Sequence, residues 1–347
     1  MLRWRDEIAA GTLLGPTLFT SGPKLEGPRP LWRGTIEVDS PAEVDAALDR
    51  LQAMRVDFVK ITDNTLRPPI FLYALEAARR RGLRTSAHTP YALTIEQAAR
   101  AGLSAIEHLD YLIKAGSPEE GRVAADFAAG RLTYAQAVDR LSETFDPAYA
   151  RASYRRLARL GVAVTPTLNM TRIIAWLNED DHSRDDGLAL IGPGLRRTYD
   201  WRIQRAANWT AGEIASRRRN YALSLRVLPM LRDAGIPILA GTDAGFLNSF
   251  NYPGIGLHDE LARYVEAGLT PTEALRSATQ TGPAFLGHAA RYGRLDAGRT
   301  ADILLLDANP LAEIANTRRI HTVVSRGRVL DRATLDRFLA SARAAAH

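Results

Sequence analysis

The stretch RTSAHTPYALTIEQAARAGLSAIEHLD, residues 84–110, decides the fold class of this chain. It begins and ends with short strand-like runs, RTSAH and AIEH, whose last residues are His88 and His108. Between the runs the pattern is helical, and Thr94 with Gln97 three residues later matches the capping box of a helix N-terminus. A strand, a helix and a second strand in this order predict a parallel βαβ unit.

The same alternation continues on both sides of this stretch. Further strand-like runs lie at residues 16–20, 56–61, 162–168 and 237–241, and helical patterns lie at residues 41–54, 70–81 and 149–160. Apolar strands that are each followed by a helix indicate a parallel sheet covered on both faces. We predict an α/β fold of the (β/α)-barrel type rather than an open doubly wound sheet, because no glycine-rich phosphate loop follows any early strand.

Two long helical insertions interrupt this pattern, at residues 114–160 and 170–230. Long excursions after barrel strands commonly form lids or substrate walls, and we expect that role here. The first residues predict a helix that ends at Gly11. They carry charges where a signal peptide would have an apolar run, so no signal peptide is predicted.

The chain changes character near its C-terminal end. Strand-like runs at residues 301–306 and 320–325 predict a small β annex, and an Ala-rich helical pattern follows. We therefore predict a barrel domain over residues 1–292, β-sandwich strands over residues 293–332 and a C-terminal helix over residues 333–347.

The composition excludes several classes of site. None of the 347 residues is Cys, which excludes disulfides and thiolate metal sites. The net charge of +6 is modest, and we interpret the arginine runs at residues 79–81 and 217–219 as solvated helix faces. We expect no nucleic-acid or membrane partner, because basic residues do not alternate with aromatics and no apolar stretch reaches about 20 residues. The cytoplasm is only the default expectation for the compartment.

Lys60 lies inside the apolar run VDFVKI, residues 56–61. A lysine in an apolar strand is costly unless its charge is paired or removed. One interpretation is a strand-end lysine whose amine reaches water. The other is a lysine carboxylated to a carbamate, which would turn a cation into an anionic metal ligand.

Three other strand ends carry candidate residues: His88, His108 and Asp243. Each has an ordinary structural interpretation, either a hydrogen-bonded core histidine or an aspartate that caps the next segment. However, the C-terminal ends of barrel strands converge, so the two histidines would point into one space, where neutral imidazoles suit zinc. Asp243, flanked by small residues in GTDAG, would then act as a metal-proximal general base and acid.

The order Lys, His, His, Asp at successive strand ends resembles the amidohydrolase superfamily, and more narrowly its imidazolonepropionase-like and Xaa-Pro or Xaa-Arg dipeptidase-like branch. Several strings are similar to that branch: VDFVKI, AIEHLD, TPTL, GTDA, LHDEL, AGLTPTEAL and GRLDAGRTADI. The resemblance covers nearly the whole chain. No single string is specific, but their combination is.

The resemblance implies a distorted TIM-type (β/α)8 barrel with a small β-sandwich and one or two divalent metal ions, usually zinc. It implies that Lys60 is a carboxylated bridging ligand and that His88 and His108 bind one metal ion. It also implies that Asp243 binds the other ion and carries the proton during hydrolysis.

The resemblance also bears on substrate binding. It places His258 where the branch often has a substrate-contacting residue, although a histidine that simply begins a helix remains an alternative. Tyr91 and Asn169 follow predicted strands, and we expect both to line the substrate pocket.

The chain departs from the family in one respect. The family carries His-x-His at its first barrel strand, but no two histidines of this chain are two residues apart. We expect a barrel that lacks its first two strands, with a rearranged homologue as the alternative. In such a barrel, one zinc ion held by Lys60, His88 and His108 is expected to bind tightly, because three protein ligands plus water make a workable site.

Together these features predict a metal-dependent hydrolase of amide, peptide or cyclic amide C–N bonds, with a small-molecule amide or dipeptide substrate and a possible homo-oligomeric state. The main alternative is a catalytically incompetent barrel fragment or pseudoenzyme. A phosphate-ester hydrolase is less well supported, because the sequence offers no glycine-rich phosphate loop.

Overall fold

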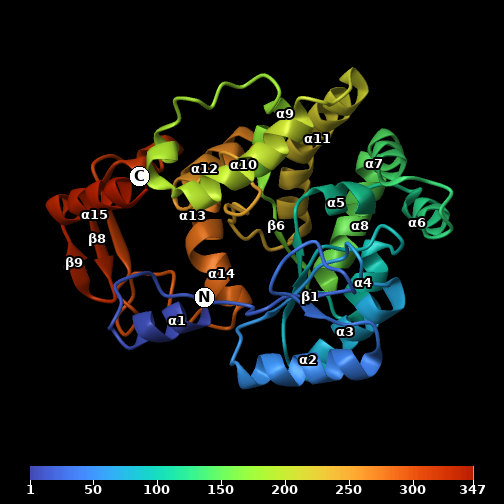
Figure 1. Cartoon of the computed structure of the whole chain (residues 1–347), viewed down its shortest axis with the longest axis horizontal. Coiled ribbons are helices and arrows are strands. Elements are labelled where there is room, and N and C mark those ends of the chain that lie inside the picture. Colours follow the sequence, from blue (N-terminus) through green and yellow to red (C-terminus); the bar gives the residue numbers. More distant parts are fainter. Residues whose placement is uncertain (347) are drawn as a thin grey trace. The chain divides into compact units, whose positions relative to one another are not determined.

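The computed structural model describes residues 1–346 and divides into two compact units (Figure 1). Unit 1 comprises Met1–Thr165 and Leu231–Pro237, and unit 2 comprises Pro166–Met230 and the described residues from Ile238 onward. Residue 347, the last of the predicted C-terminal helix, lies outside the described residues. Each unit is described by itself.

Unit 1 is built on a parallel sheet of six strands in the order β2-β1-β3-β4-β5-β6. The strands are β1 (Leu25–Glu26), β2 (Ile36–Glu37), β3 (Val59–Ile61), β4 (Thr85–Ala87), β5 (Ala105–Glu107) and β6 (Ala163–Thr165). The predicted βαβ unit at residues 84–110 and the parallel α/β sheet are confirmed. Closure into an eight-stranded barrel stays a prediction.

One predicted strand of unit 1 is wrong. Residues 16–20 form no strand, and the first strands lie at β1 and β2 instead. The reason is local, because the polar main-chain groups of Thr20 bond to a single residue rather than to a ladder. The Asp57 N–H donates to the Thr20 carbonyl at 2.9 Å, and the Thr20 N–H donates to the Asp57 carboxylate at 2.6 Å.

The predicted helices of unit 1 are present. They are α1 (Leu2–Ala9), α2 (Pro41–Ala53), α3 (Pro68–Arg80), α4 (Ile95–Ala101) and α8 (Pro147–Arg159). The capping box of α4 is confirmed, since the Thr94 hydroxyl accepts from the Gln97 N–H and the Gln97 side chain accepts from the Thr94 N–H. The core between helices and sheet is aliphatic and aromatic, and its fully buried members include Leu48, Leu51, Phe71, Leu75, Ile106 and Val164.

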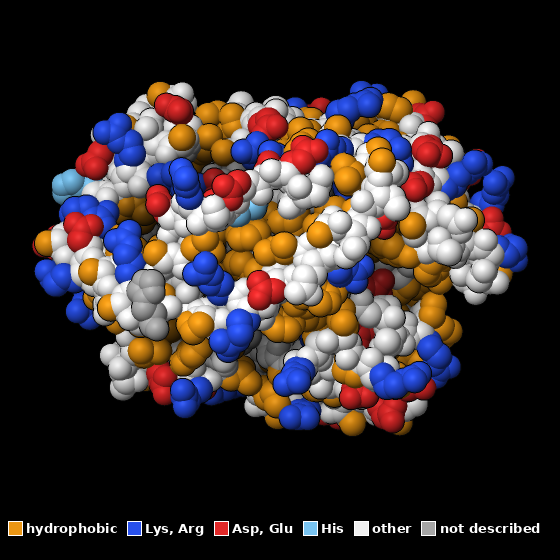
Figure 2. Space-filling view, turned by 45° about the horizontal axis from the view of Figure 1, so that its top comes forward, with side chains coloured by type: hydrophobic (Ala, Val, Ile, Leu, Met, Phe, Trp, Pro, Cys, Tyr) orange, Lys and Arg blue, Asp and Glu red, His pale blue; other side chains and the backbone are white. Residues whose placement is uncertain are grey.

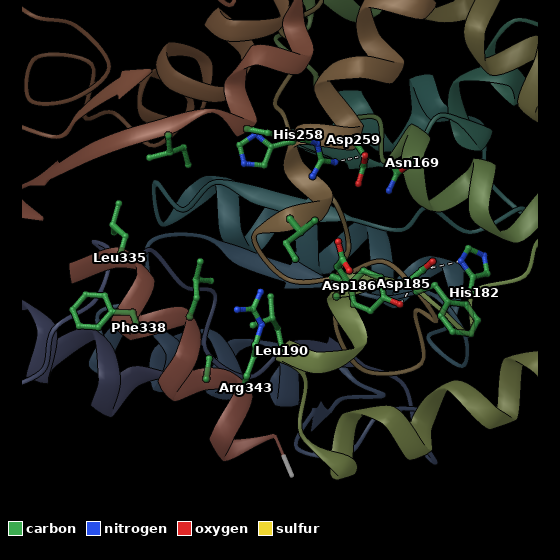
Figure 3. Close-up of a pocket in the computed structure, with 18 of the residues that line it drawn as sticks. Asn169, His182, Asp185, Asp186, Leu190, His258, Asp259, Leu335, Phe338 and Arg343 are labelled. Atoms are coloured by element: carbon green, nitrogen blue, oxygen red, sulfur yellow. Dashed lines mark hydrogen bonds and ion pairs between the residues drawn. The ribbon is translucent and has the colours of Figure 1, made fainter. Parts of the chain in front are cut away.

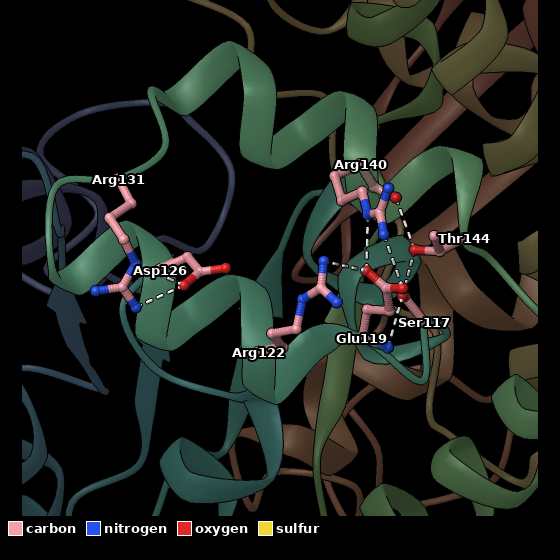
Figure 4. Close-up of polar contacts among 7 residues, drawn as sticks. All are labelled: Ser117, Glu119, Arg122, Asp126, Arg131, Arg140 and Thr144. Carbon is pink, nitrogen blue, oxygen red and sulfur yellow. Dashed lines mark hydrogen bonds and ion pairs between the residues drawn. The ribbon is translucent and has the colours of Figure 1, made fainter.

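The first predicted insertion forms α5 (Asp110–Ala115), α6 (Glu120–Ala128) and α7 (Tyr134–Glu143), followed by α8. Polar contacts hold α6 and α7 together (Figure 4). The carboxylate of Glu119 accepts from Arg140 at 2.7 Å and lies 3.8 Å from Arg122, and Ser117 bonds to Thr144 at 2.7 Å. These contacts fix the insertion as an ordered part of unit 1.

Unit 2 is mainly helical and ends in a small antiparallel sheet. Its helices are α9 (Leu168–Trp176), η1 (Asp186–Leu190), α10 (Pro193–Ala206), α11 (Ala211–Ala234, which continues into unit 1), α12 (Ile255–Glu266), α13 (Pro271–Arg276), η2 (Ser277–Thr281), α14 (Gly282–Phe285), η3 (Ile314–Arg318) and α15 (Arg332–Ala345). The sheet, in the order β7-β8-β9, contains β7 (Ile303–Leu306), β8 (Ile320–Ser325) and β9 (Arg328–Leu330). The expected β annex is therefore present as three antiparallel strands, and the predicted domain boundaries stay a prediction.

The predicted strand at residues 237–241 is not formed. None of these described residues belongs to a strand longer than a single bridge, although the Pro237 carbonyl accepts from the Val164 N–H of β6 at 2.9 Å. Pro237 has no N–H to donate to a neighbouring strand on its other side, which disfavours a regular strand at this position. The predicted strand at residues 162–168 is shorter than expected, because α9 begins at Leu168.

The two arginine runs differ in their surroundings. Arg79 and Arg80 are exposed on α3, as expected. On α11, in contrast, Arg217 lies 4.0 Å from the Trp209 ring centroid and Arg218 pairs with Glu179. The solvated-face interpretation is therefore wrong for this half-buried pair. On the face shown in Figure 2, basic side chains are interspersed with acidic ones. Within residues 1–346, no helix combines the length and apolarity that crossing a membrane requires.

Candidate active site

The carboxyl edge of the unit 1 sheet brings together three of the predicted residues. Lys60 is the middle residue of β3 and pairs in register with Ser86 of β4. His88 and His108 directly follow β4 and β5, and their main chains are still bonded to neighbouring strands. The His88 N–H donates to the Ile61 carbonyl at 3.1 Å, and the His108 N–H donates to the Thr165 carbonyl at 2.8 Å. These main-chain hydrogen bonds to the sheet therefore fix the positions from which both imidazole side chains project.

The two imidazoles face each other. The Nε2 atoms of His88 and His108 are 3.1 Å apart, and the ring centroids are 4.9 Å apart. Burial lowers the pKa of His88 well below its ordinary value, and the positive charge of Lys60 and the neighbouring His108 lower it further. His88 is therefore neutral near pH 7, which is the form of imidazole that binds a metal. The convergence expected from the sequence is confirmed, while the role as ligands stays a prediction.

Glu107 is the ion-pair partner of Lys60, and no pattern in the sequence marked it as a site residue. Its carboxylate lies 3.7 Å from the Lys60 amine and accepts from the Ser86 hydroxyl. Burial alone would raise the pKa of Glu107, but the Lys60 charge, the Ser86 hydroxyl and the charge of His108 together hold it below its ordinary value. Lys60 is thus mostly buried, and its charge is paired with that of Glu107. A lysine within an apolar strand requires such pairing, because an unpaired buried charge is costly.

Two more carboxyl groups lie near this edge, and both were missed. Glu26 ends β1, is fully buried, and accepts from the Thr65 N–H at 3.1 Å and the Asn64 amide at 3.0 Å. Burial raises the pKa of Asp63 to about 6, with the negative charge of Glu26 adding to the effect. β1 has only two residues, so no strand pattern marked Glu26 as a strand-end residue.

The donor atoms at this edge suit a divalent metal ion. Two imidazole nitrogens bound to one tetrahedral zinc ion at about 2.05 Å would lie about 3.3 Å apart, close to the distance found. Across residues 1–346, no cluster of three or more His, Asp or Glu side chains is arranged to hold a metal ion. The role of Lys60 as a carboxylated ligand stays a prediction.

In unit 2, Asp243 is held in place by its neighbours. Its backbone is left-handed, with φ of 57°, and the Asn248 amide donates to its Oδ2 at 2.7 Å and also to its main-chain carbonyl. Arg202 of α10 donates in turn to the Asn248 side-chain oxygen at 3.1 Å and to the Leu247 carbonyl at 2.8 Å. Arg202 was not selected from the sequence, because it lies within a helix 41 residues earlier in the chain (243 − 202).

The two predicted substrate residues of unit 2 line one cavity of about 1000 Å³ (Figure 3). Asn169 of α9 is buried, and its amide donates to Asn251 at 3.3 Å. His258 of α12 is hydrogen-bonded to Thr317 at 3.0 Å, and burial lowers its pKa, as does the charge of Arg318. Leu335 and Phe338 of α15 line the same cavity (Figure 3). The third predicted substrate residue, Tyr91, is buried in unit 1 beside His88 and lines a different cavity.

A comparison with protein families decides the ancestry of this chain. The profile of the amidohydrolase family matches residues 56–330, which is most of the sequence. The chain belongs to the amidohydrolase family. The match includes Lys60, His88, His108 and Asp243, so the resemblance predicted from the strand ends is confirmed.

Similar proteins agree with this assignment. Imidazolonepropionase of Chromobacterium violaceum is 40% identical over 86 residues, which span 24% of this chain and only 20% of that enzyme. Among solved structures, bottromycin amidohydrolase superposes with a TM-score of 0.72 at 22% identity, covering 99% of this chain and 72% of the other. A Xaa-Pro dipeptidase with bound methionine gives a TM-score of 0.63 at 18% identity, covering 95% and 72%. At these identities, the structural likenesses show the amidohydrolase fold.

Proposed function

We propose that this amidohydrolase cleaves the C–N bond of a small amide or dipeptide, with a divalent metal ion at the carboxyl edge of the unit 1 sheet. The observation that carries the proposal is the His88–His108 pair, whose Nε2 atoms lie 3.1 Å apart. Two imidazoles at this separation, on adjacent parallel strands, match the donor geometry of a zinc site.

Lys60, His88 and His108 would hold the ion, with Lys60 as a carbamate. A bound zinc ion supplies Lewis-acid polarisation of the scissile carbonyl and lowers the pKa of the attacking water. Addition of CO2 to the Lys60 amine, with loss of two protons from the ammonium now paired with Glu107, would give an anionic carbamate. Glu107 would then lose its cationic partner, and the positive charge of the ion would take its place.

Asp243 is the proposed general base and acid. This is the role that the family resemblance implies for it, and a carboxylate transfers a proton from water to a leaving nitrogen well when its orientation is fixed. The Asn248 amide donates to Oδ2 of Asp243 and so restricts the orientation of the carboxylate. Arg202 fixes the Asn248 side chain, so Asn248 and Arg202 together set the orientation of the base.

A second candidate, a barrel that binds but does not turn over, is favoured by one observation. The Lys60–Glu107 ion pair satisfies both charges without a carbamate or a metal ion. If this pairing is the whole role of Lys60, the edge of the sheet is structural.

The two candidates are separated by assaying dipeptide and N-acyl amino acid hydrolysis with and without added zinc. The proposal expects zinc-dependent hydrolysis that falls at least about a hundredfold in His88→Gln and in Asp243→Asn, and stays unchanged in a His321→Gln control at an exposed position. Hydrolysis that is indifferent to zinc or to both substitutions would overturn it. A wild-type protein that binds zinc but cleaves none of these amides would favour the second candidate.

A further inference from the structure

Beside His88, unit 1 contains a second feature that the proposed chemistry does not use. It is a cavity of about 530 Å³, here called the aromatic pocket, whose main walls are the rings of Tyr91, Tyr111, Phe127 and Tyr134. Its size lies within the usual range for small-molecule sites. Tyr91 comes from the loop after β4, and the other three rings come from α5, α6 and α7, the helices of the first insertion (Figure 1).

The four rings form one cluster centred on Tyr91. The centroid of the Tyr91 ring is 4.9 Å from that of Tyr134, and 6.0 Å from those of Phe127 and Tyr111. The interplanar angles, between 51° and 66°, are tilted or edge-to-face. Aromatic rings prefer this arrangement at these separations, and a further ring entering the pocket would meet the same geometry.

Lys114 of α5 supports the loop that carries Tyr91. It is only 1% exposed, and its amine donates to the Pro90 carbonyl at 2.9 Å and to the Leu93 carbonyl. These bonds fix both sides of the loop that carries Tyr91, and the amine itself lies 5.1 Å from the Tyr91 ring centroid. The Lys114 amine is therefore bonded to the loop carbonyls, and Lys114 is not among the residues that line the cavity.

The polar residues of the pocket gather beside the proposed catalytic edge. His88 lines the pocket and also faces His108, so one member of the histidine pair is part of the pocket wall. Asp63 and Asn64 follow β3 and complete the polar side. No Lys or Arg is among the described residues that line the cavity, so it offers no cation to a substrate carboxylate. Burial raises the pKa of Asp63 to about 6, so its charged form is disfavoured in this cavity.

We propose that the aromatic pocket receives a neutral aromatic side chain of the amide substrate, next to the bond whose carbonyl lies at the His88–His108 pair. This inference rests on the proposed amide hydrolysis, because it uses that site to place the scissile bond. The selectivity follows from the walls: four rings favour a fifth, an aliphatic methyl leaves the pocket unfilled, and a guanidinium would have to give up its hydration among apolar rings.

The test measures binding first, so that it does not depend on turnover. The probes are the N-acetyl methylamides of phenylalanine, alanine and arginine, titrated calorimetrically into the full chain. The variants are Tyr134→Ala and Phe127→Ala. Tyr134 is 58% exposed, so its removal leaves the fold intact. Tyr149→Ala on α8, a half-buried tyrosine that lies over Arg156 rather than in the pocket, is the matched control.

We expect the phenylalanine probe to bind at least about tenfold more tightly than the other two. Both pocket variants should reduce this preference to less than about threefold, and Tyr149→Ala should keep it. Equal binding of the three probes, no binding of any, or an undiminished preference in both pocket variants would overturn the assignment. Circular dichroism and thermal unfolding of each variant check that a lost preference is not a lost fold.

The measurement of kcat/KM on the same three amides separates this inference from the proposed function. Selective binding without hydrolysis would uphold the aromatic pocket and overturn the hydrolase. Hydrolysis of phenylalanine and alanine amides with equal kcat/KM and equal affinity would uphold the hydrolase and overturn the aromatic pocket.

Discussion

Glu260 of α12 provides the sharpest test of the physical account of unit 2. Its side chain is fully buried, and its carboxylate accepts from the Leu168 N–H at 2.8 Å and the Asn169 N–H at 2.7 Å, at the start of α9. Burial raises the pKa of Glu260 from its ordinary value of 4.5 to about 7, although these hydrogen bonds oppose the change. We therefore predict that Glu260→Gln, an isosteric mimic of the protonated acid, changes how stability depends on pH.

The sign and size follow from linkage. A carboxyl group whose pKa is raised in the folded state stabilises that state fully below about pH 4.5, and this stability is lost as the pH rises through about 7. The difference between 4.5 and about 7, at about 1.4 kcal/mol for each pH unit, amounts to about 3 to 4 kcal/mol. Relative to Glu260→Gln, the wild-type protein should lose about that much stability between about pH 4.5 and about pH 8.

Urea unfolding of both proteins across that range measures the effect, because subtracting the two curves cancels every other titrating group. The same carboxyl-to-amide change at the exposed Glu313 is the control. If the two backbone N–H donors outweigh burial, the wild-type protein will instead gain stability over Glu260→Gln as the pH rises. A flat or rising difference would refute the claim that burial dominates at this site.

Three further predictions concern single side chains. Asn248→Ala should lower kcat about tenfold with little change in KM, because Asp243 loses the amide that orients it; steady-state kinetics on an amide substrate checks this, and rescue by Asn248→Gln would support orientation as the cause. Lys114→Met should cost about 2 to 3 kcal/mol in urea unfolding, since the Pro90 and Leu93 carbonyls lose their buried donor, and an unchanged midpoint would contradict this. Gly187→Ala should lower the unfolding free energy by about 1 to 3 kcal/mol, because an added Cβ would lie 2.4 Å from the Tyr252 ring; an unchanged Tm would count against that packing.

The residues that converge at the strand ends could be predicted from the sequence where the sheet is regular. β3, β4 and β5 are adjacent and parallel, so Lys60, His88 and His108 had to reach one edge. The Glu107 contact was beyond this reasoning. Successive strand residues point to opposite faces, so Glu107 and His108 were not expected at one site. His108, however, has φ of 72°, which breaks the alternation and allows both side chains to lie at the same edge.

Other contacts could not be predicted because they join distant parts of the sequence. Glu26 lies at the end of a two-residue strand, which is too short to give a recognisable pattern. Arg202 lies on a helix whose periodicity can predict which positions are buried but not which residue Arg202 contacts. The aromatic pocket unites a β4 loop with an insertion that the sequence marked only as a lid or wall. The pattern of polar and apolar residues along the sequence does not show which aromatic rings come into contact in the folded chain.

The left-handed residues connect these observations. His108, Thr167 and Asp243 each have φ between 52° and 72° at or just beyond a strand-like segment that the sequence had marked. Aspartate and histidine are enriched in this conformation, but a β-branched residue such as Thr167 is an outlier there. The turn at Thr167 starts α9 without a side-chain cap, and the buried carboxylate of Glu260 supplies the missing acceptor for the next two N–H groups. The strain at Thr167 and the buried acid therefore depend on each other: the carboxylate compensates a helix start that the sequence disfavours, and the position of Asn169 in its cavity depends on both.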